Sequence, residues 1–296
     1  MNIFSYSRSV TSESKQRLLL VHAHPDDETL TTGGIAALYA ARGAQVTIVT
    51  CTLGEEGEII PEDLRHLSAE EGDQLGGYRI YELYAACDAL GVTDHRFLGA
   101  AGRWRDSGMT WHQPGQAGRA NKTHPRAFAT GNLGEQVAAL ERLLQDVNPQ
   151  VVVTYASDGG YGHPDHIRAH DVTMAAVANA PSVERVFHIA TSTSARESGL
   201  SKLAESGDCP YPLTAINGPS SDEATITTSV DVYQHLSDIL DALRAHRTQV
   251  ETWANFAGLA AYALSNGVGQ PVLTTEHFNL VRGPVAGCET DLFGGL

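Results

Sequence analysis

Two short motifs that combine histidine, proline and aspartate could bind a metal ion. The first is residues 24–28 (HPDDE) and the second is residues 163–166 (HPDH). In each motif the first and fourth residues are potential ligands, and residues three positions apart lie on the same side of a helical turn. Two imidazoles and one carboxylate form a common ligand set for a catalytic Zn²⁺, which leaves one position open for water. The two motifs together therefore predict a metal-dependent hydrolase.

The first motif supplies two predicted ligands and a candidate general base. His24 and Asp27 are the ligands, and Asp26 lies beside them without a ligand role. A carboxylate in that position can take a proton from the attacking water, because a metal ion lowers the pKa of such water. The acidic residues Asp26, Asp27 and Glu28 also have a structural explanation, since negative charge in a first helical turn interacts favourably with the helix dipole.

The second motif supplies the third ligand. His166 is the predicted ligand, although the sequence alone does not decide between His163 and His166. With His166 on the metal, His163 is free to donate a hydrogen bond to a developing oxyanion or to the leaving group. Asp165 is predicted to accept an N–H from an imidazole and so to fix the orientation of that ring. An equally good explanation for Asp165 is that it caps the following helix.

The composition indicates an acidic globular protein. The 296 residues carry a formal charge of −15, the pI is near 5.2, and 42% of the residues are hydrophobic. Nucleic acids and anionic membranes attract cationic surfaces, so we expect a small-molecule substrate and neither of these as a partner. The four cysteines (Cys51, Cys87, Cys209 and Cys288) are scattered along the chain, which favours reduced thiols and a cytoplasmic location.

Alternating strands and helices predict an α/β fold with a doubly wound (Rossmann-like), mostly parallel sheet and a smaller C-terminal lobe. The expected strands are residues 17–23, 45–51, 96–98, 151–155 and 185–190, and the expected helices are residues 32–42, 68–91, 133–147 and 164–181. In a sheet of order 3-2-1-4-5 the first and fourth strands are neighbours, and ligands bind beyond their carboxyl ends. The two motifs follow these two strands, so the fold is expected to bring them together.

The chain is predicted to divide into four parts. Residues 1–16 form a flexible N-terminal tail, residues 17–193 the α/β catalytic core, residues 194–222 an irregular insertion or lid, and residues 223–296 the C-terminal elements that complete the same domain. The insertion is rich in Ser, Gly and Pro, which are typical of turns and loops. A second long irregular region is expected at residues 99–131, and loops of such length are often functional.

The motifs carry a resemblance to a known family. Together with residues 49–58 (VTCTLGEEGE), 73–80 (DQLGGYRI) and 102–109 (GRWRDSGM), they resemble the PIG-L/LmbE-like family of zinc-dependent N-acetylglucosaminide deacetylases. The similarity covers most of the chain and is poor between residues 182 and 223. It implies hydrolysis of the acetamide of an N-acetylglucosamine conjugate. The implied substrate is N-acetylglucosaminyl-inositol of mycothiol biosynthesis, and the implied cofactor is Zn²⁺ or alternatively Fe²⁺.

The resemblance also implies roles for individual residues. His24, Asp27 and His166 correspond to the metal ligands. Asp26 corresponds to the general base. His163 corresponds to a residue that stabilises the tetrahedral intermediate and is oriented by Asp165.

Three further residues enter through the resemblance. Tyr161 lies where the family has a mobile active-site tyrosine, and Arg79 and Asp106 lie at positions implied to hold the inositol and sugar hydroxyls. An arginine with a carboxylate suits a polyol or a phosphate, and the alternative for either residue is a structural ion pair.

Three rival functions remain open at this point. A related amidase that cleaves mycothiol conjugates shares the metal motifs, and the stretch 103–106 favours the deacetylase over it. Two histidines and one aspartate also occur in non-haem Fe(II) oxygenases, but the spare carboxylate at Asp26 favours hydrolysis. A sugar-binding protein without catalytic activity would not need that carboxylate.

Overall fold

The computed structural model of the chain describes residues 15–113, 115–121, 123–214, 221, 223–284, 287 and 289–296. The predicted tail at residues 1–16 lies outside the described residues except for its last two positions. Cys51, Cys87 and Cys209 are free thiols, and Cys288 lies outside the described residues. In the described part of the chain, no helix is long and apolar enough to cross a membrane.

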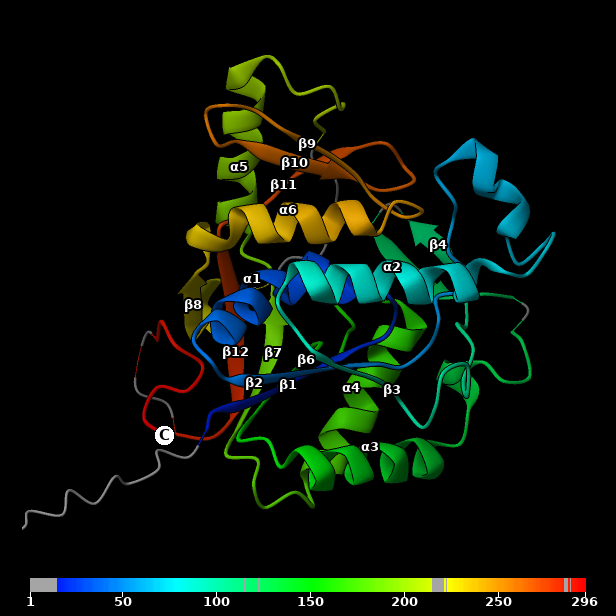
Figure 1. Ribbon diagram of the computed structural model, residues 1–296, viewed down its shortest axis with the longest axis vertical. Coiled ribbons are helices and arrows are strands. Elements are labelled where there is room, and N and C mark those ends of the chain that lie inside the picture. Colours follow the sequence, from blue (N-terminus) through cyan, green and yellow to red (C-terminus); the bar gives the residue numbers. More distant parts are fainter. Residues whose placement is uncertain are drawn as a thin grey trace, which may run out of the picture.

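A seven-stranded sheet forms the centre of the molecule (Figure 1), with the order β3-β2-β1-β6-β7-β12-β8. Its strands are β1 (Arg17–His22), β2 (Gln45–Thr50), β3 (Asp94–Phe97), β6 (Val151–Thr154), β7 (Arg185–Ala190), β8 (Thr228–Asp231) and β12 (Thr275–Arg282). The first five strands in this order pair in parallel, and β12 pairs antiparallel with both β7 and β8. The predicted strand order is confirmed, because the strands at residues 17 and 151 are neighbours.

Helices cover both faces of this sheet (Figure 1). On one face lie α1 (Asp27–Ala41), α2 (Leu75–Ala89) and α6 (Leu236–Ala245), and on the other lie α3 (Leu133–Val147) and α4 (Pro164–Val177). The side chains of β1 alternate between the two cores: Leu18 and Leu20 pack with the first group of helices, and Leu19 and Val21 with the second. This alternation follows from the two-residue period of a strand. The predicted doubly wound α/β class is confirmed.

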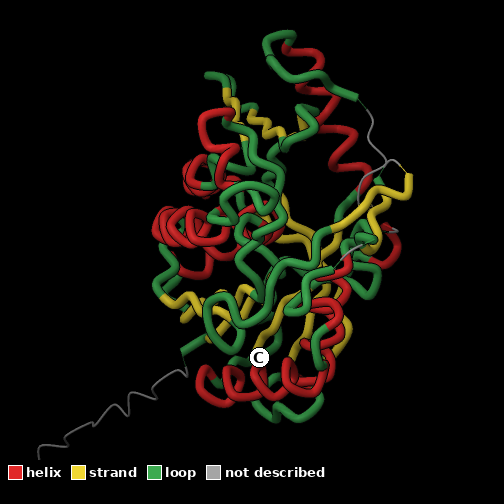
Figure 2. Tube along the Cα trace, turned by 90° about the vertical axis from the view of Figure 1, so that its right-hand side faces the viewer, coloured by secondary structure: helices red, strands yellow, loops and turns green. Residues whose placement is uncertain are grey.

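A smaller lobe lies at the end of the molecule opposite α3 in both views (Figures 1 and 2). It contains α5 (Thr193–Ser206) and a three-stranded antiparallel sheet of β9 (Glu251–Ala254), β10 (Ala260–Ala263) and β11 (Gly269–Pro271). A separate hairpin of β4 (Met109–Gln113) and β5 (Gln116–Arg119) lies within the region that we expected to be irregular. Short 3₁₀ helices occupy Glu62–Leu67, Phe128–Thr130, Glu223–Thr225 and Tyr233–His235.

The expectation that residues 194–222 are irregular is wrong for their first half, which forms α5. Ser192 caps this helix, because its side chain accepts a hydrogen bond from the N–H group of Ala195 at 3.0 Å. The helix ends at Gly207, whose φ of 70° suits glycine. Composition therefore misled the prediction, since Ser192 and Gly207 mark the ends of a helix and Ser198, Gly199 and Ser201 lie inside it. Whether the segment acts as a lid stays a prediction.

The expected start of a helix at Ser68 is also wrong. The helix α2 begins only at Leu75. The carbonyl group of Ser68 instead accepts from the N–H groups of Glu71 and Asp73 at 3.1 and 2.8 Å, which closes a turn. Asp73 has a φ of 52°, a conformation that interrupts a right-handed helix.

Two adjacent glycines of α1 offer a test of how tightly this helix is packed. A Cβ atom on Gly34 would lie 2.5 Å from a methyl group of Val232, whereas on Gly33 its nearest neighbour would lie at 3.7 Å. Gly34→Ala is therefore expected to lower the free energy of unfolding by about 1–3 kcal/mol through overpacking. Gly33→Ala is the matched control and is expected to raise it by up to about 1 kcal/mol through helix propensity. Urea unfolding measures both, and equal effects would contradict the packing.

Candidate active site

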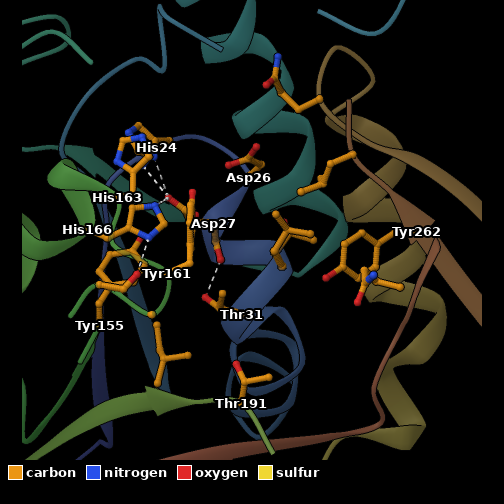
Figure 3. A pocket seen from close by; sticks show the side chains of 18 of the residues that line it. His24, Asp26, Asp27, Thr31, Tyr155, Tyr161, His163, His166, Thr191 and Tyr262 are labelled. Carbon is orange, nitrogen blue, oxygen red and sulfur yellow. Dashed lines mark hydrogen bonds and ion pairs between the residues drawn. The ribbon is translucent and has the colours of Figure 1, made fainter. Parts of the chain in front are cut away.

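The two motifs meet at the carboxyl ends of β1 and β6. The register pairs Leu18 with Val151 and Leu20 with Val153, so both strands end at the same edge of the sheet. The turn before α1 and the turn before α4 therefore lie side by side. Figure 3 shows His24, His163 and His166 grouped beside Asp27. The prediction that the strand order brings the two motifs together is confirmed.

The carboxylate of Asp27 lies between two imidazoles. Its Oδ2 atom is 3.2 Å from His24 Nδ1 and 3.3 Å from His166 Nε2, and it accepts the backbone N–H of His24 at 3.0 Å. The second nitrogen of each ring faces another acceptor. His24 Nε2 lies 3.3 Å from Asp165 Oδ2, and His166 Nδ1 lies 3.2 Å from the carbonyl oxygen of Gly159. Both rings are thus oriented with one nitrogen toward Asp27.

This arrangement fits a metal ion. Ligand atoms about 2.0–2.1 Å from a tetrahedral metal lie about 3.3 Å from one another, which matches both separations around Asp27 Oδ2. His166 Nε2 is buried and makes no hydrogen bond of good geometry among the described residues, although Asp27 Oδ2 lies 3.3 Å away. A metal ion bound to both atoms would satisfy them. Among the described residues, ligand atoms of His24, His163 and His166 lie within 4.8 Å of one another, as do those of His24, Asp106 and Asp165. Asp27 joins the first group through its contacts with His24 and His166.

His163 occupies a different position from His166. It is the N-cap residue of α4, and its Nδ1 atom accepts a hydrogen bond from the backbone N–H of Asp165 at 3.1 Å. The proton of a neutral His163 ring must then lie on Nε2. The resemblance implies that Asp165 orients His163, and in the structure it does so through its backbone, whereas its carboxylate faces His24. Ser107 holds that carboxylate with its hydroxyl and, at 2.8 Å, with its N–H group.

Asp26 lies next to these residues in an uncommon backbone conformation, with φ 125° and ψ −32°. Its Oδ2 atom is 3.0 Å from Arg79 Nη2, and the guanidinium also donates to the carbonyl groups of Gly54 and Pro25. Burial raises the pKa of Asp26 to about 6, and the charge of Arg79 opposes this rise. The contacts of Arg79 are those of the structural ion pair that we considered as its alternative.

Asp106 lies directly beside His24, one of the predicted metal ligands. Its Oδ1 atom is 3.6 Å from His24 Nε2 and accepts the N–H of Gly108 at 2.9 Å. Burial alone would raise the pKa of Asp106, but the imidazole of His24 keeps it well below the usual value. Asp106 and Arg79 both line the cavity described below.

Two tyrosines complete the walls of the site. The ring of Tyr161 meets His166 edge-on at 5.1 Å between ring centres and stacks on Trp111 at 6.0 Å. Tyr155 was not predicted as a site residue. Its ring stacks on His166 at 4.2 Å, and its hydroxyl accepts the N–H of Ala23 at 2.9 Å. The feature of the sequence that could have identified Tyr155 is its position directly after β6, the strand that precedes the second motif.

The site opens into a large cavity of about 1120 Å³. Asp26, Asp106 and Tyr161 line it near the histidines, and Tyr262 and Glu276 line its far side. Figure 3 shows Tyr262 across α1 from the three histidines. A cavity of this size is large enough for a conjugate of two rings.

Comparisons with known proteins identify the family of this chain. The family described as "PIG-L: GlcNAc-PI de-N-acetylase" matches residues 19–177, which is more than half of the chain. The chain belongs to the PIG-L family. This confirms the resemblance that the motifs carried.

Two curated relatives of this PIG-L chain share the same activity in their names. The "1D-myo-inositol 2-acetamido-2-deoxy-alpha-D-glucopyranoside deacetylase 1" of Saccharopolyspora erythraea is 61% identical over 97% of this chain and 96% of its own length. The corresponding deacetylase of Actinosynnema mirum is 59% identical over 97% of this chain and 99% of its own. A solved deacetylase–teicoplanin complex has a TM-score of 0.52 at 21% identity, covers 90% and 98% of the two chains, and supports the fold alone.

Asp165→Asn tests whether the buried carboxylate supports metal binding through His24. We expect its metal affinity to fall by about 10–100-fold, because the neutral amide loses the negative charge that makes the His24 imidazole a stronger ligand. Competition with a chelator measures this affinity. Ser107→Ala is the control, since it removes a partner of Asp165 and leaves the contact with His24 in place. Wild-type metal affinity in Asp165→Asn would contradict this role.

Proposed function

We propose that this PIG-L protein is a metal-dependent N-deacetylase whose substrate is N-acetylglucosaminyl-inositol of mycothiol biosynthesis. The observation that carries the proposal is the position of Asp26, a partly buried carboxylate that faces the cavity beside a set of metal-ligating side chains. The names of the two relatives, which are at least 59% identical along nearly the whole chain, support the choice of substrate. The free thiols of Cys51, Cys87 and Cys209 support a cytoplasmic location.

His24, Asp27 and His166 would hold the metal ion, which we propose to be Zn²⁺, with Fe²⁺ as the alternative. Two imidazoles and one carboxylate suit either ion. When bound, the metal would polarise the acetamide carbonyl and lower the pKa of the attacking water. The orientation of both imidazoles by Asp165 and Gly159 supports this ligand set.

The remaining residues have separable tasks in the hydrolysis. Asp26 takes the proton of the attacking water, and Arg79 keeps its carboxylate directed into the cavity. His163 can donate from Nε2 to the oxyanion of the tetrahedral intermediate, because its Nδ1 atom is occupied as an acceptor. The hydroxyl of Tyr161, which also lines the cavity, can donate a second hydrogen bond to this oxyanion. Asp26, which carries the proton taken from water, then gives it to the leaving amine, because a neutral His163 with its Nδ1 atom occupied has no proton to spare.

Arg79 and Asp106 are proposed to contact the sugar and inositol hydroxyls. Both line the cavity beside the histidines. Asp106 can accept hydrogen bonds from sugar hydroxyls, since the pKa shift keeps it ionised. The contacts of Arg79 with Asp26 and with backbone carbonyls limit how many hydrogen bonds its guanidinium can add to a substrate.

Acetate release tests the proposal directly. We expect the purified protein with Zn²⁺ to release acetate from N-acetylglucosaminyl-inositol with a higher kcat/KM than from N-acetylglucosamine, because the second ring adds contacts in the cavity. A thiol-conjugate amide is the third substrate. Faster hydrolysis of that amide would favour the related amidase activity, and activity that requires dioxygen would favour an oxygenase.

Asp26→Asn tests the general base. We expect kcat to fall by about 10²–10⁴-fold, the usual contribution of a positioned base. The metal content should stay at the wild-type level, since Asp26 is not among the proposed ligands. Metal analysis and acetate release on the same sample separate these effects, and near-normal kcat would show that Asp26 only caps α1.

A further inference from the structure

The general base lies on a strained piece of backbone. Asp26 has a φ of 125°, a region that L residues rarely occupy because it is strained. Its carbonyl group already accepts from the N–H groups of Thr29 and Leu30 at 3.0 and 2.9 Å, as the start of α1 requires. Such a conformation persists only where the surroundings hold it. The partner of the backbone N–H of Asp26 therefore determines the direction in which the Asp26 carboxylate points.

That partner is the carboxylate of Glu28. Its Oε2 atom accepts the N–H of Asp26 at 2.9 Å. Its Oε1 atom accepts the hydroxyl of Thr29 at 2.6 Å and faces His246 Nε2 at 2.7 Å. Glu28 and His246 both have 0% exposure, so bulk solvent does not reach these contacts. Glu28 has no predicted place among the metal ligands and was explained from the sequence only as a helix-end charge.

His246 comes from a distant part of the chain. It directly follows α6 and lies 218 residues after Glu28 in the sequence. Its carbonyl group accepts from the N–H groups of Gln249 and Val250, both at 2.9 Å, which closes a tight turn. The backbone hydrogen bonds of its own turn thus fix the position of His246. His246 in turn fixes the carboxylate of Glu28 through the contact with its Nε2 atom.

We propose that Glu28 and His246 are positioning residues for the general base. His246 fixes the carboxylate of Glu28, and Glu28 fixes the strained backbone of Asp26, so that the base points at the attacking water. This inference rests on the proposed function, in which Asp26 is the base. A purely structural role for the pair would affect stability and leave the turnover of the folded enzyme unchanged.

The protein contains a matched control for this chain of contacts. Glu82 is also a buried carboxylate and holds the same turn, because it accepts the N–H and the hydroxyl of Thr248 at 2.8 and 2.7 Å. Among the described residues, no hydrogen bond or ion pair joins Glu82 to Asp26 or to the metal-ligating side chains. A substitution of Glu82 therefore removes the side chain that holds Thr248, whereas the backbone hydrogen bonds that fix His246 and the partner of Asp26 stay in place.

The experiment compares Glu28→Met, Glu28→Gln and Glu82→Met in acetate release from N-acetylglucosaminyl-inositol at saturating Zn²⁺. Methionine matches the length of the side chain and cannot accept the N–H of Asp26. We expect Glu28→Met to lose about 10²-fold in kcat with little change in KM, the scale reported for a misplacement of about 1 Å. Glu28→Gln keeps one acceptor oxygen and should recover most of that loss. Glu82→Met should lower the melting temperature and keep the wild-type kcat.

His246→Leu keeps the test valid if Glu28→Met does not fold. This variant keeps Glu28 but removes its contact with the imidazole of His246. We expect kcat to fall while KM and metal content stay unchanged. Wild-type kcat in either Glu28→Met or His246→Leu, or an equal loss in Glu82→Met, would overturn the positioning role. Absence of acetate release by the wild-type protein would instead overturn the proposed function, and the two failures are therefore distinguishable.

Discussion

The parallel pairing of β1 with β6 is the constraint on which the site depends. The two strands are 133 residues apart at the paired positions Leu18 and Val151, and their common register makes them end at one edge of the sheet. Each strand is followed at once by a turn that carries histidine and aspartate. A shift of register would move one turn along the strand direction by about 3.3 Å per residue. Such a shift is comparable to the separations that join Asp27 to its two imidazoles.

The second constraint is electrostatic. The imidazole of His24 lies among the carboxylates of Asp27, Asp106 and Asp165, all of them buried. Burial alone would lower the pKa of His24, but these carboxylates raise it well above the usual value. Buried charges of one sign are unfavourable unless an opposite charge compensates them. The excess of carboxylates therefore favours a cation at this point, and it explains why so many hydrogen bonds converge on Asp165.

From the sequence, the predicted strand order was enough to identify the site residues that directly follow β1 and β6. The residues of the two motifs were found because their positions after strands place them at one sheet edge. Ser107 and Tyr155 were missed, because their roles arise from contacts between a long connection and the end of a strand, which no spacing rule describes. The Ser- and Gly-rich composition of α5 and the false cap at Ser68 misled the prediction for a related reason. In both cases the same residue types serve at helix ends and in turns.

The contacts of α1 show why the C-terminal elements belong to the catalytic unit, although the family match ends at residue 177. Glu276 on β12 accepts the N–H groups of Gly34 and Ile35 at 2.7 and 2.9 Å, in the middle of α1. His246 holds the start of the same helix through Glu28. The matched region alone would lack these contacts, including the one between the buried side chains of Glu28 and His246. The helix that presents Asp26 and Asp27 is therefore oriented from both halves of the chain, which ties the geometry of the base to the folding of the segment after residue 177.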